Sequence, residues 1–234
     1  LIWMTFKMND TSGFKIEFKR HNRAKRMKLR YDASTGNAVV TMPPRSSERA
    51  AKKFAESNIL WLEKQRRSSP HRKCLLPGET IPFEGIDHLI IHDPAKRAGV
   101  EIISEKIIVG GTIEGFSVRL ENFFKKKARA SIEPLAKNMA LAINQSFRRI
   151  QIRDTKSRWG SCSSSGTLSF SWRLIMTPPD ILEYVVAHEI SHLKEMNHSK
   201  SFWDVVDKLV YDAKYSRKWL KGEEGQSLML IISE

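Results

Sequence analysis

The chain has few cysteines and no long apolar segment. Its two cysteines, Cys74 and Cys162, do not form a CxxC pair, which excludes a disulfide-rich framework and a thiolate zinc cluster. No apolar run approaches the roughly 20 residues that a membrane-spanning helix needs. The apolar stretch 1–6 lacks the basic flank and the cleavage site of a signal peptide. We therefore predict a cytoplasmic protein without membrane contact.

Acidic residues are scarce in the first third of the chain. Residues 1–75 hold 18 Lys and Arg against 6 Asp and Glu, so +12 of the net charge of +14 lies there. A basic region of this kind attracts polyanions, and it predicts weak contact with nucleic acid or another polyanion. Neither aromatic interleaving nor an RNA-binding signature accompanies the charge, so the sequence does not predict a dedicated nucleic-acid site.

The hydrophobic pattern predicts an α+β protein in two parts. Residues 1–112 form a basic, β-rich region, in which strands with two-residue alternation surround one amphipathic helix at about 46–67. Residues 113–234 form a catalytic domain that opens with a long helix at 116–144. Pro134 lies inside that helix and is expected to kink it or split it into two.

The second part changes character after the long helix. The pattern predicts strands at 150–153 and 167–172, separated by a Gly- and Ser-rich turn at 160–166. A helix follows, because a proline pair that ends at Pro179 precedes apolar residues with helical spacing. We expect this helix to end near Asn197.

Residues 188–192 of this helix read HEISH and match the pattern HExxH. Positions four apart on a helix share one face, so His188 and His192 can reach one metal ion from one side. Glu189 is placed to contact a metal-bound water and to take its proton as general base. Zinc with three protein ligands leaves a fourth position for that water and lowers its pKa to about 7.

A third ligand is available shortly after the motif. His198 follows His192 by six residues, and we predict that it completes the site. Asp204 and Asp207 are the alternative third ligands, of the carboxylate type. His88 and His92 are also four apart, but they lie in a predicted strand, where that spacing separates them by about 13 Å, so we predict structural or exposed roles for them.

Several motifs carry a family resemblance. In chain order they are RWGSCS at 158–163, WRL at 172–174, PP at 178–179, YVVAHEISHL at 184–193, NHS at 197–199 and FW at 202–203. With these motifs the chain resembles the YgjP-like metallohydrolases, which are related to the SprT and WLM zincins. The resemblance is strong over about 115–212 and weaker over the basic N-terminal region. It implies a minimal zincin fold with a metal, zinc or another divalent ion, at His188, His192 and His198, and with Glu189 as general base.

The resemblance leaves the substrate open. Peptide hydrolysis is the main hypothesis, because the family is usually assigned to the metallopeptidases. The first alternative is pyrophosphate hydrolysis of UTP, which the resemblance also implies. The second is a nucleic-acid-associated protease of the SprT type, which would use the basic N-terminal region. A purely structural metal is the remaining alternative.

Each enzyme hypothesis predicts its own substrate contacts. A peptidase needs an edge strand beside the metal, and Gly166–Ser171 is the candidate. A pyrophosphatase needs cations around the phosphates. The cations near the predicted strands are Arg153, Lys156, Arg158 and Arg173. The alternative is that these cations lie on a solvated sheet face, with a structural ion pair for Arg158. Trp159 can either stack on a base or pack.

Overall fold

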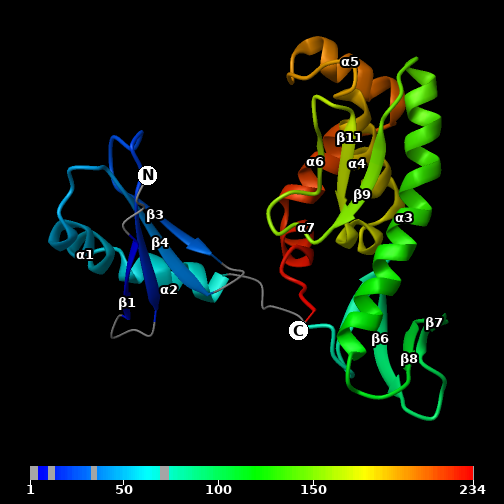
Figure 1. The fold of residues 1–234 in the computed structure, drawn as a ribbon, viewed down its shortest axis with the longest axis horizontal. Helices are drawn as coiled ribbons and strands as arrows, with labels where there is room; N and C mark the ends of the chain where they lie inside the picture. Colours follow the sequence, from blue (N-terminus) through cyan, green and yellow to red (C-terminus); the bar gives the residue numbers. More distant parts are fainter. Residues whose placement is uncertain (1–4, 10–13, 33–35, 69–73, 234) are drawn as a thin grey trace. The chain divides into compact units, whose positions relative to one another are not determined.

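The computed structural model describes residues 5–9, 14–32, 36–68 and 74–233. The chain divides into two compact units, Leu1–His71 and Arg72–Glu234, and both contain strands and helices (Figure 1). Helices and three sheets occur together in the chain, so the predicted α+β class is confirmed. In the described part of the chain, no helix combines the length and the apolar character that a membrane crossing requires.

The first unit contains a four-stranded sheet. Its strands, in the spatial order β1-β2-β4-β3, are β1 (Thr5–Asn9), β2 (Lys15–Arg20), β4 (Asn37–Met42) and β3 (Lys28–Asp32). β2 and β4 pair in parallel, and β3 pairs with β4 antiparallel. Alternate residues of β2 and β4, such as Ile16, Phe18 and Val40, are fully buried. This burial follows the two-residue period of a sheet with one face on a core.

The predicted single helix of this unit is two helices, α1 (Glu48–Glu56) and α2 (Ile59–Ser68). The break lies at Ser57 and Asn58. The Ser57 hydroxyl and the Asn58 amide both donate to the Phe54 carbonyl, at 3.0 and 2.8 Å. Side chains that bond to the last carbonyls of a helix favour its end. The apolar period continues across the break, so the pattern alone predicted one helix.

The second sheet belongs to the second unit. Its strands, in the order β5-β6-β8-β7, are β5 (Thr80–Phe83), β6 (Ile86–Asp93), β8 (Lys106–Gly110) and β7 (Gly99–Ile103). Ile81, Ile90 and Val109 share one hydrophobic core with the long helix α3 (Phe116–Ala142). The predicted boundary at residue 112 therefore differs from the division at residue 71. The strand pattern grouped this sheet with the N-terminal strands. In the structure its apolar face packs on α3, within the second unit.

The long helix α3 is continuous although Pro134 lies inside it, so the predicted split into two helices does not occur. Proline lacks the N–H that would bond to the carbonyl four residues earlier, here that of Ala130. Both residues are exposed, so water can satisfy this carbonyl. Ile132 and Ala136 are fully buried on the other face and hold the helix on the core on both sides of the proline.

The third sheet lies beside the HExxH helix, α4 (Pro179–Ser191). Its strands, in the order β10-β11-β9, are β10 (Gly160–Cys162), β11 (Thr167–Ser171) and β9 (Arg149–Arg153). β11 is the central strand and is paired on both sides. The prediction of a peptide-binding edge at Gly166–Ser171 is therefore wrong. The edge strand next to α4 is β10, which is formed by residues that the pattern predicted as part of a turn.

An ion pair between a buried arginine and a partly exposed aspartate connects this sheet to the C-terminal segment. Arg173, with a side chain only 1% exposed, pairs with the Asp154 carboxylate and also donates from Nε to the Ile231 carbonyl at 2.8 Å. Burial acts to raise the pKa of Asp154, but the hydrogen bond and the charge of Arg173 outweigh it and hold the pKa below its usual value. The apolar residues Leu228–Ile231 are buried, so the C-terminal segment docks within its own unit.

Replacement of Arg173 tests the role of this pair. Arg173→Met leaves the Asp154 carboxylate and the Ile231 carbonyl without their shared donor. We expect the free energy of unfolding to fall by about 1–3 kcal/mol, because the Ile231 carbonyl loses its donor while the partly exposed Asp154 carboxylate can be solvated. Urea unfolding followed by tryptophan fluorescence measures the change. Arg153→Met, at an exposed arginine of the same sheet, is the matched control, and an equal effect of the two substitutions would contradict the assignment.

Candidate metal centre

The two helical histidines lie on the same side of α4. The helix begins with Pro179 in its first turn, where a missing N–H costs no hydrogen bond. Its apolar residues, among them Ile181, Val186 and Ile190, are buried, and this burial fixes its rotation on the core. The rings of His188 and His192 stand with centroids 5.0 Å apart, as expected for residues one turn apart.

The helix ends earlier than the pattern predicted. Its last residue is Ser191 and His192 is the C-cap, so the predicted end near Asn197 is wrong. The next N–H groups bond three residues back, as in the 3.0 Å bond from the Leu193 N–H to the Ile190 carbonyl. Such bonds tighten and close the last turn. The chain is then free to turn back toward α4.

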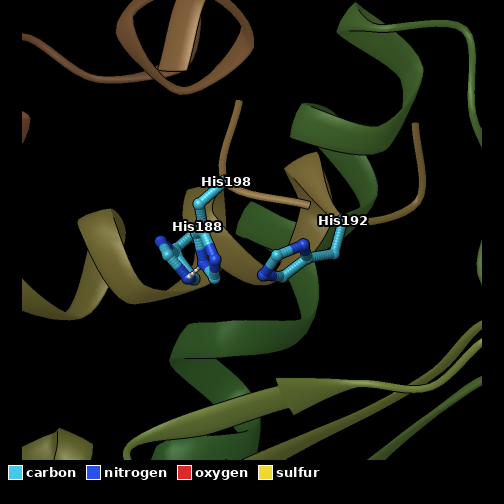
Figure 2. Close-up of side chains that lie close together, drawn as sticks. All are labelled: His188, His192 and His198. Atoms are coloured by element: carbon cyan, nitrogen blue, oxygen red, sulfur yellow. Dashed lines mark hydrogen bonds between the residues drawn. The ribbon is translucent and has the colours of Figure 1, made fainter. Parts of the chain in front are cut away.

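This turn brings His198 to the helical histidines. Its Nε2 lies 3.1 Å from Nε2 of His188, and candidate ligand nitrogens of His188, His192 and His198 all lie within 4.8 Å of one another. Figure 2 shows the rings of His188 and His198 side by side, with His192 pointing toward them. The three predicted ligands therefore lie close enough together to share one metal ion.

The following helix, α5 (Lys200–Leu209), packs under this cluster. Ser199 is its N-cap, and the Ser199 N–H donates to the Asn197 side-chain oxygen at 3.2 Å. Phe202 is fully buried, and its ring centroid lies 4.6–4.9 Å from those of all three histidines. A ring packed against all three imidazoles limits their rotation. α5 thus supports the cluster from the core side.

In His188 and His192 the Nδ1 atom contacts a protein oxygen, so the Nε2 atom is left to bind a metal. Nδ1 of His192 lies 3.0 Å from the Glu195 carbonyl, and Nδ1 of His188 lies 3.4 Å from the Tyr184 hydroxyl. A ring nitrogen that faces a carbonyl carries the proton, so Nε2 of His192 keeps its lone pair. Burial, and then the neighbouring His192 and His198, lower the pKa of His188 to about 3; burial also lowers that of His192. Neutral imidazole is the form that binds a metal.

These three nitrogens fit a metal ion such as zinc. Two nitrogens at about 2.0–2.1 Å from a shared tetrahedral ion lie about 3.3 Å apart, and His188 and His198 are already at 3.1 Å. Three imidazoles suit zinc and several other divalent metals. The alternative ligands Asp204 and Asp207 are exposed, and Asp204 pairs with Lys200 at 3.3 Å. The metal-capable group that contains the three histidines includes neither aspartate.

Glu189 faces the edge strand β10 and is only 6% exposed. A Cβ at Gly160 would stand 2.6–2.9 Å from Cγ, Oε1 and Cδ of Glu189, so any larger residue there would displace the Glu189 carboxylate. Burial raises the pKa of Glu189 to about 8, against the lowering effects of a Cys162 backbone hydrogen bond and of the Arg158 charge. Burial and the Glu189 charge raise the pKa of the Cys162 thiol to about 11. The thiol therefore stays protonated at neutral pH.

Two of the four predicted substrate-binding residues lie near the cluster. Trp159 is half-buried and lines a cavity that His188 and His198 also line. Arg158 is exposed, and it is close enough to Glu189 for its charge to lower the pKa of that carboxyl. Both residues immediately precede β10.

The other two lie in different surroundings. Arg153 is exposed at the end of β9, and its Nε donates to the Gln151 side-chain oxygen at 2.8 Å. Arg173 is buried in its pair with Asp154, so its guanidinium is committed to the fold and does not face the cavity. Arg173 thus forms the kind of structural ion pair that the sequence offered as the alternative role of Arg158.

A cavity of about 520 Å³ adjoins the histidines, and we call it the cationic cavity. Its lining includes Lys156, Trp159, Tyr184, His188, Arg217 and Lys221. Arg217 and Lys221 belong to none of the motifs in the sequence. Both lie on α6 (Ala213–Lys221), well beyond the motif. The one signal in the sequence is that this helix has four cations and no acidic residue.

A family model of the YgjP-like metallopeptidase domain matches residues 25–223. The chain belongs to the YgjP-like family. The resemblance carried by the motifs is confirmed, and membership in the YgjP-like family supports a metal-dependent, peptidase-like role. It also implies a divalent metal, for which the three histidines are the candidate ligands.

Two solved structures of metallopeptidase zymogens are similar to parts of this YgjP-like chain. Abylysin from Pyrococcus abyssi is 26% identical with a TM-score of 0.35, and the match covers 38% of this chain and 93% of abylysin. Jannalysin from Methanocaldococcus jannaschii is 22% identical with a TM-score of 0.33, and the match covers 38% of this chain and 89% of jannalysin. A comparison with curated proteins gave no match.

The ligand assignment is tested by metal affinity. His198→Ala leaves two imidazoles, and we expect the zinc affinity to fall by more than about 100-fold. Asp204→Asn removes the alternative ligand and should change the affinity less than about twofold, because Asp204 pairs with Lys200. Competition with a chromophoric chelator measures both. A large loss in Asp204→Asn with none in His198→Ala would reverse the assignment.

The burial of Glu189 predicts a pH effect on the metal-free protein. The pKa of about 8 lies above the ordinary 4.5, so the folded state keeps a proton that the unfolded state releases between these values. The stability that this proton contributes is lost as the pH rises through 8. Glu189→Gln removes the effect. The variant should match the wild type at pH 4 and exceed it at pH 9 by on the order of 4 kcal/mol.

Urea unfolding of both chelator-treated proteins at the two pH values measures this difference. Equal stability of the two proteins at pH 9 would show that the carboxylate is solvated.

Proposed function

We propose that this YgjP-like protein is a metal-dependent peptidase, with zinc as the preferred metal, bound by His188, His192 and His198. The observation that carries the proposal is the position of Glu189 between the histidine cluster and the edge strand β10, against Gly160. When bound, the metal supplies a Lewis acid that polarises the scissile carbonyl and lowers the pKa of water. The residues of the chain supply the proton transfer and the substrate position.

The backbone of β10 supports the binding of an extended peptide. Trp159 accepts from the Ser171 N–H at 2.8 Å, and the Ser163 N–H donates to Thr167 at 3.0 Å. Backbone groups alternate in direction along a strand, so those of Gly160, between these two bonds, point away from β11. A peptide that pairs with such an edge is held by main-chain hydrogen bonds. It would lie beside the Glu189 carboxylate.

Glu189 has the environment of a general base. The Cys162 backbone hydrogen bond and the Arg158 charge favour its ionised form, which is the form that accepts a proton from the attacking water. The Cys162 backbone hydrogen bond orients the carboxylate. The same carboxyl then donates this proton to the nitrogen of the leaving amine, so the carboxylate is regenerated at the end of the reaction.

UTP is the second candidate substrate. Lys156, Arg217 and Lys221 line the cavity beside His188, and cations next to a metal favour phosphate groups. Arg153 and Arg173 contribute less to phosphate binding than the sequence predicted. Arg153 is hydrogen-bonded to Gln151, and Arg173 is buried. The SprT-like alternative depends on the charge of the first unit alone and stays a prediction of the sequence.

Glu189→Gln tests the general-base role. The amide keeps the shape of the side chain but cannot accept the proton, so we expect kcat for peptide hydrolysis to fall by about 10²–10⁴, with zinc content unchanged. Glu183→Gln, on the same helix, should keep its activity. Hydrolysis is followed with fluorogenic peptides, and pyrophosphate release from UTP is measured in parallel. A variant with full activity and full zinc content would exclude Glu189 as the base.

A further inference from the structure

We propose that the cationic cavity binds a carboxylate of the substrate on the C-terminal side of the cleaved bond. The YgjP-like enzyme would then select peptides with Asp or Glu, or a free C-terminus, at that side. Lys156, Arg217 and Lys221 are the residues that determine this selectivity. The inference rests on the proposed peptidase function and adds the substrate class.

The cations of this cavity are available to a ligand. Among the described residues, no carboxylate lies within 4.0 Å of Lys156, Arg217 or Lys221 in an ion pair. The Arg217 guanidinium stands 4.1 Å above the Trp203 ring. That ring lies 5.9–6.0 Å from the rings of His188 and His198. The positive charge of Arg217 is therefore held close to the histidine cluster by stacking.

A second cavity adjoins the cluster at His192, whereas the cationic cavity adjoins it at His188 and His198. It measures about 470 Å³, and we call it the serine-lined cavity. Its lining includes Arg148, Ser163, Ser165, Gly166, His192 and Met196. One cation lines it, against three in the cationic cavity. A negative group on the substrate is therefore favoured on one side of the cluster.

The edge strand connects the two cavities. Lys156 and Trp159 of the cationic cavity precede β10 in the chain, whereas Ser163 and Gly166 of the serine-lined cavity follow it. A peptide paired with β10 thus extends from one cavity to the other past Glu189. The direction of β10 decides which end of the peptide enters which cavity.

Antiparallel pairing puts the C-terminal part of the peptide in the cationic cavity. Antiparallel strands pair somewhat more stably than parallel ones and are more common, and β10 itself pairs antiparallel with β11. A peptide that runs opposite to β10 has its N-terminal part beside Ser163 and its C-terminal part beside Lys156. The three cations then face the residues downstream of the cleaved bond. Trp159 and Tyr184 offer apolar walls for the stem of a Glu side chain.

Affinity selection tests the charge preference without turnover. Metal-loaded Glu189→Gln protein is immobilised and exposed to blocked decapeptide libraries, randomised except for one central position fixed as Glu or as Gln. We expect the Glu library to be enriched about fivefold over the Gln library, a factor in the range of partly exposed ion pairs. The enrichment should disappear when Arg217→Gln and Lys221→Gln are added. It should persist with Lys214→Gln and Lys218→Gln, which remove the same charge from the same helix.

Cleavage by the active enzyme locates the preference. Mass spectrometry of digested libraries should place Asp and Glu downstream of the cleaved bond, and peptides with free and amidated C-termini separate the side-chain carboxylate from the terminal one. An acidic preference upstream of the bond would overturn the proposed direction. Equal enrichment of the two libraries, or the same loss in both double variants, would overturn the cavity assignment.

The two hypotheses fail in different ways. Enrichment that depends on Arg217 and Lys221 without any peptide cleavage would support the cavity and remove the peptidase function. Cleavage without charge preference would keep the peptidase function and remove the cavity assignment. Hydrolysis of UTP that depends on these cations, with no peptide enrichment, would assign the cavity to phosphate and overturn the proposal.

Discussion

The contact between Glu189 and Gly160 is the constraint on which the site depends. α4 carries Glu189 between His188 and His192, so the distance from this helix to the sheet sets the distance from the metal centre to the substrate. With only hydrogen on the Cα of residue 160, the carboxylate can lie against the edge strand. A side chain there would displace the Glu189 carboxylate from this position. Gly160 therefore keeps the carboxylate beside the edge where a peptide would pair.

The position of the edge strand depends in turn on buried contacts outside the site. The segment that leads into β10 starts at Asp154, which pairs with Arg173 and accepts a 3.0 Å hydrogen bond from the Trp172 indole. Arg173 also holds the C-terminal segment through Ile231. Trp172 stacks on Phe124 of α3 at 5.9 Å between ring centroids. The long helix, the C-terminal segment and the edge strand are thus joined through one buried arginine and one indole, and this rigid support positions the site.

The sequence predicted the histidine cluster better than its surroundings, because the three histidines lie close together in the chain. The HExxH spacing puts His188 and His192 on one face of a helix. His198 follows them closely enough in the chain that a short turn can bring it back to them. β10 could not be predicted in this way, because Gly160–Cys162 has little strand propensity and becomes a strand by pairing with β11. Arg173 follows the alternating apolar residues Leu168, Phe170 and Trp172 at a position where that alternation predicts an exposed side chain. Its partner Ile231 is 58 residues away, and no spacing rule connects them.

The two sides of the histidine cluster differ in charge, and this difference bears on the choice between peptide and nucleotide. A triphosphate would satisfy the cations of the cationic cavity, but it would leave the backbone groups of Gly160 and the serine-lined cavity without a partner. An extended peptide with a carboxylate downstream of the cleaved bond uses all three features at once. Main-chain pairing along β10 also places a carbonyl beside Glu189 irrespective of the side chains. The arrangement of edge strand, base and cations therefore fits a peptide over its whole length and a nucleotide over one part only.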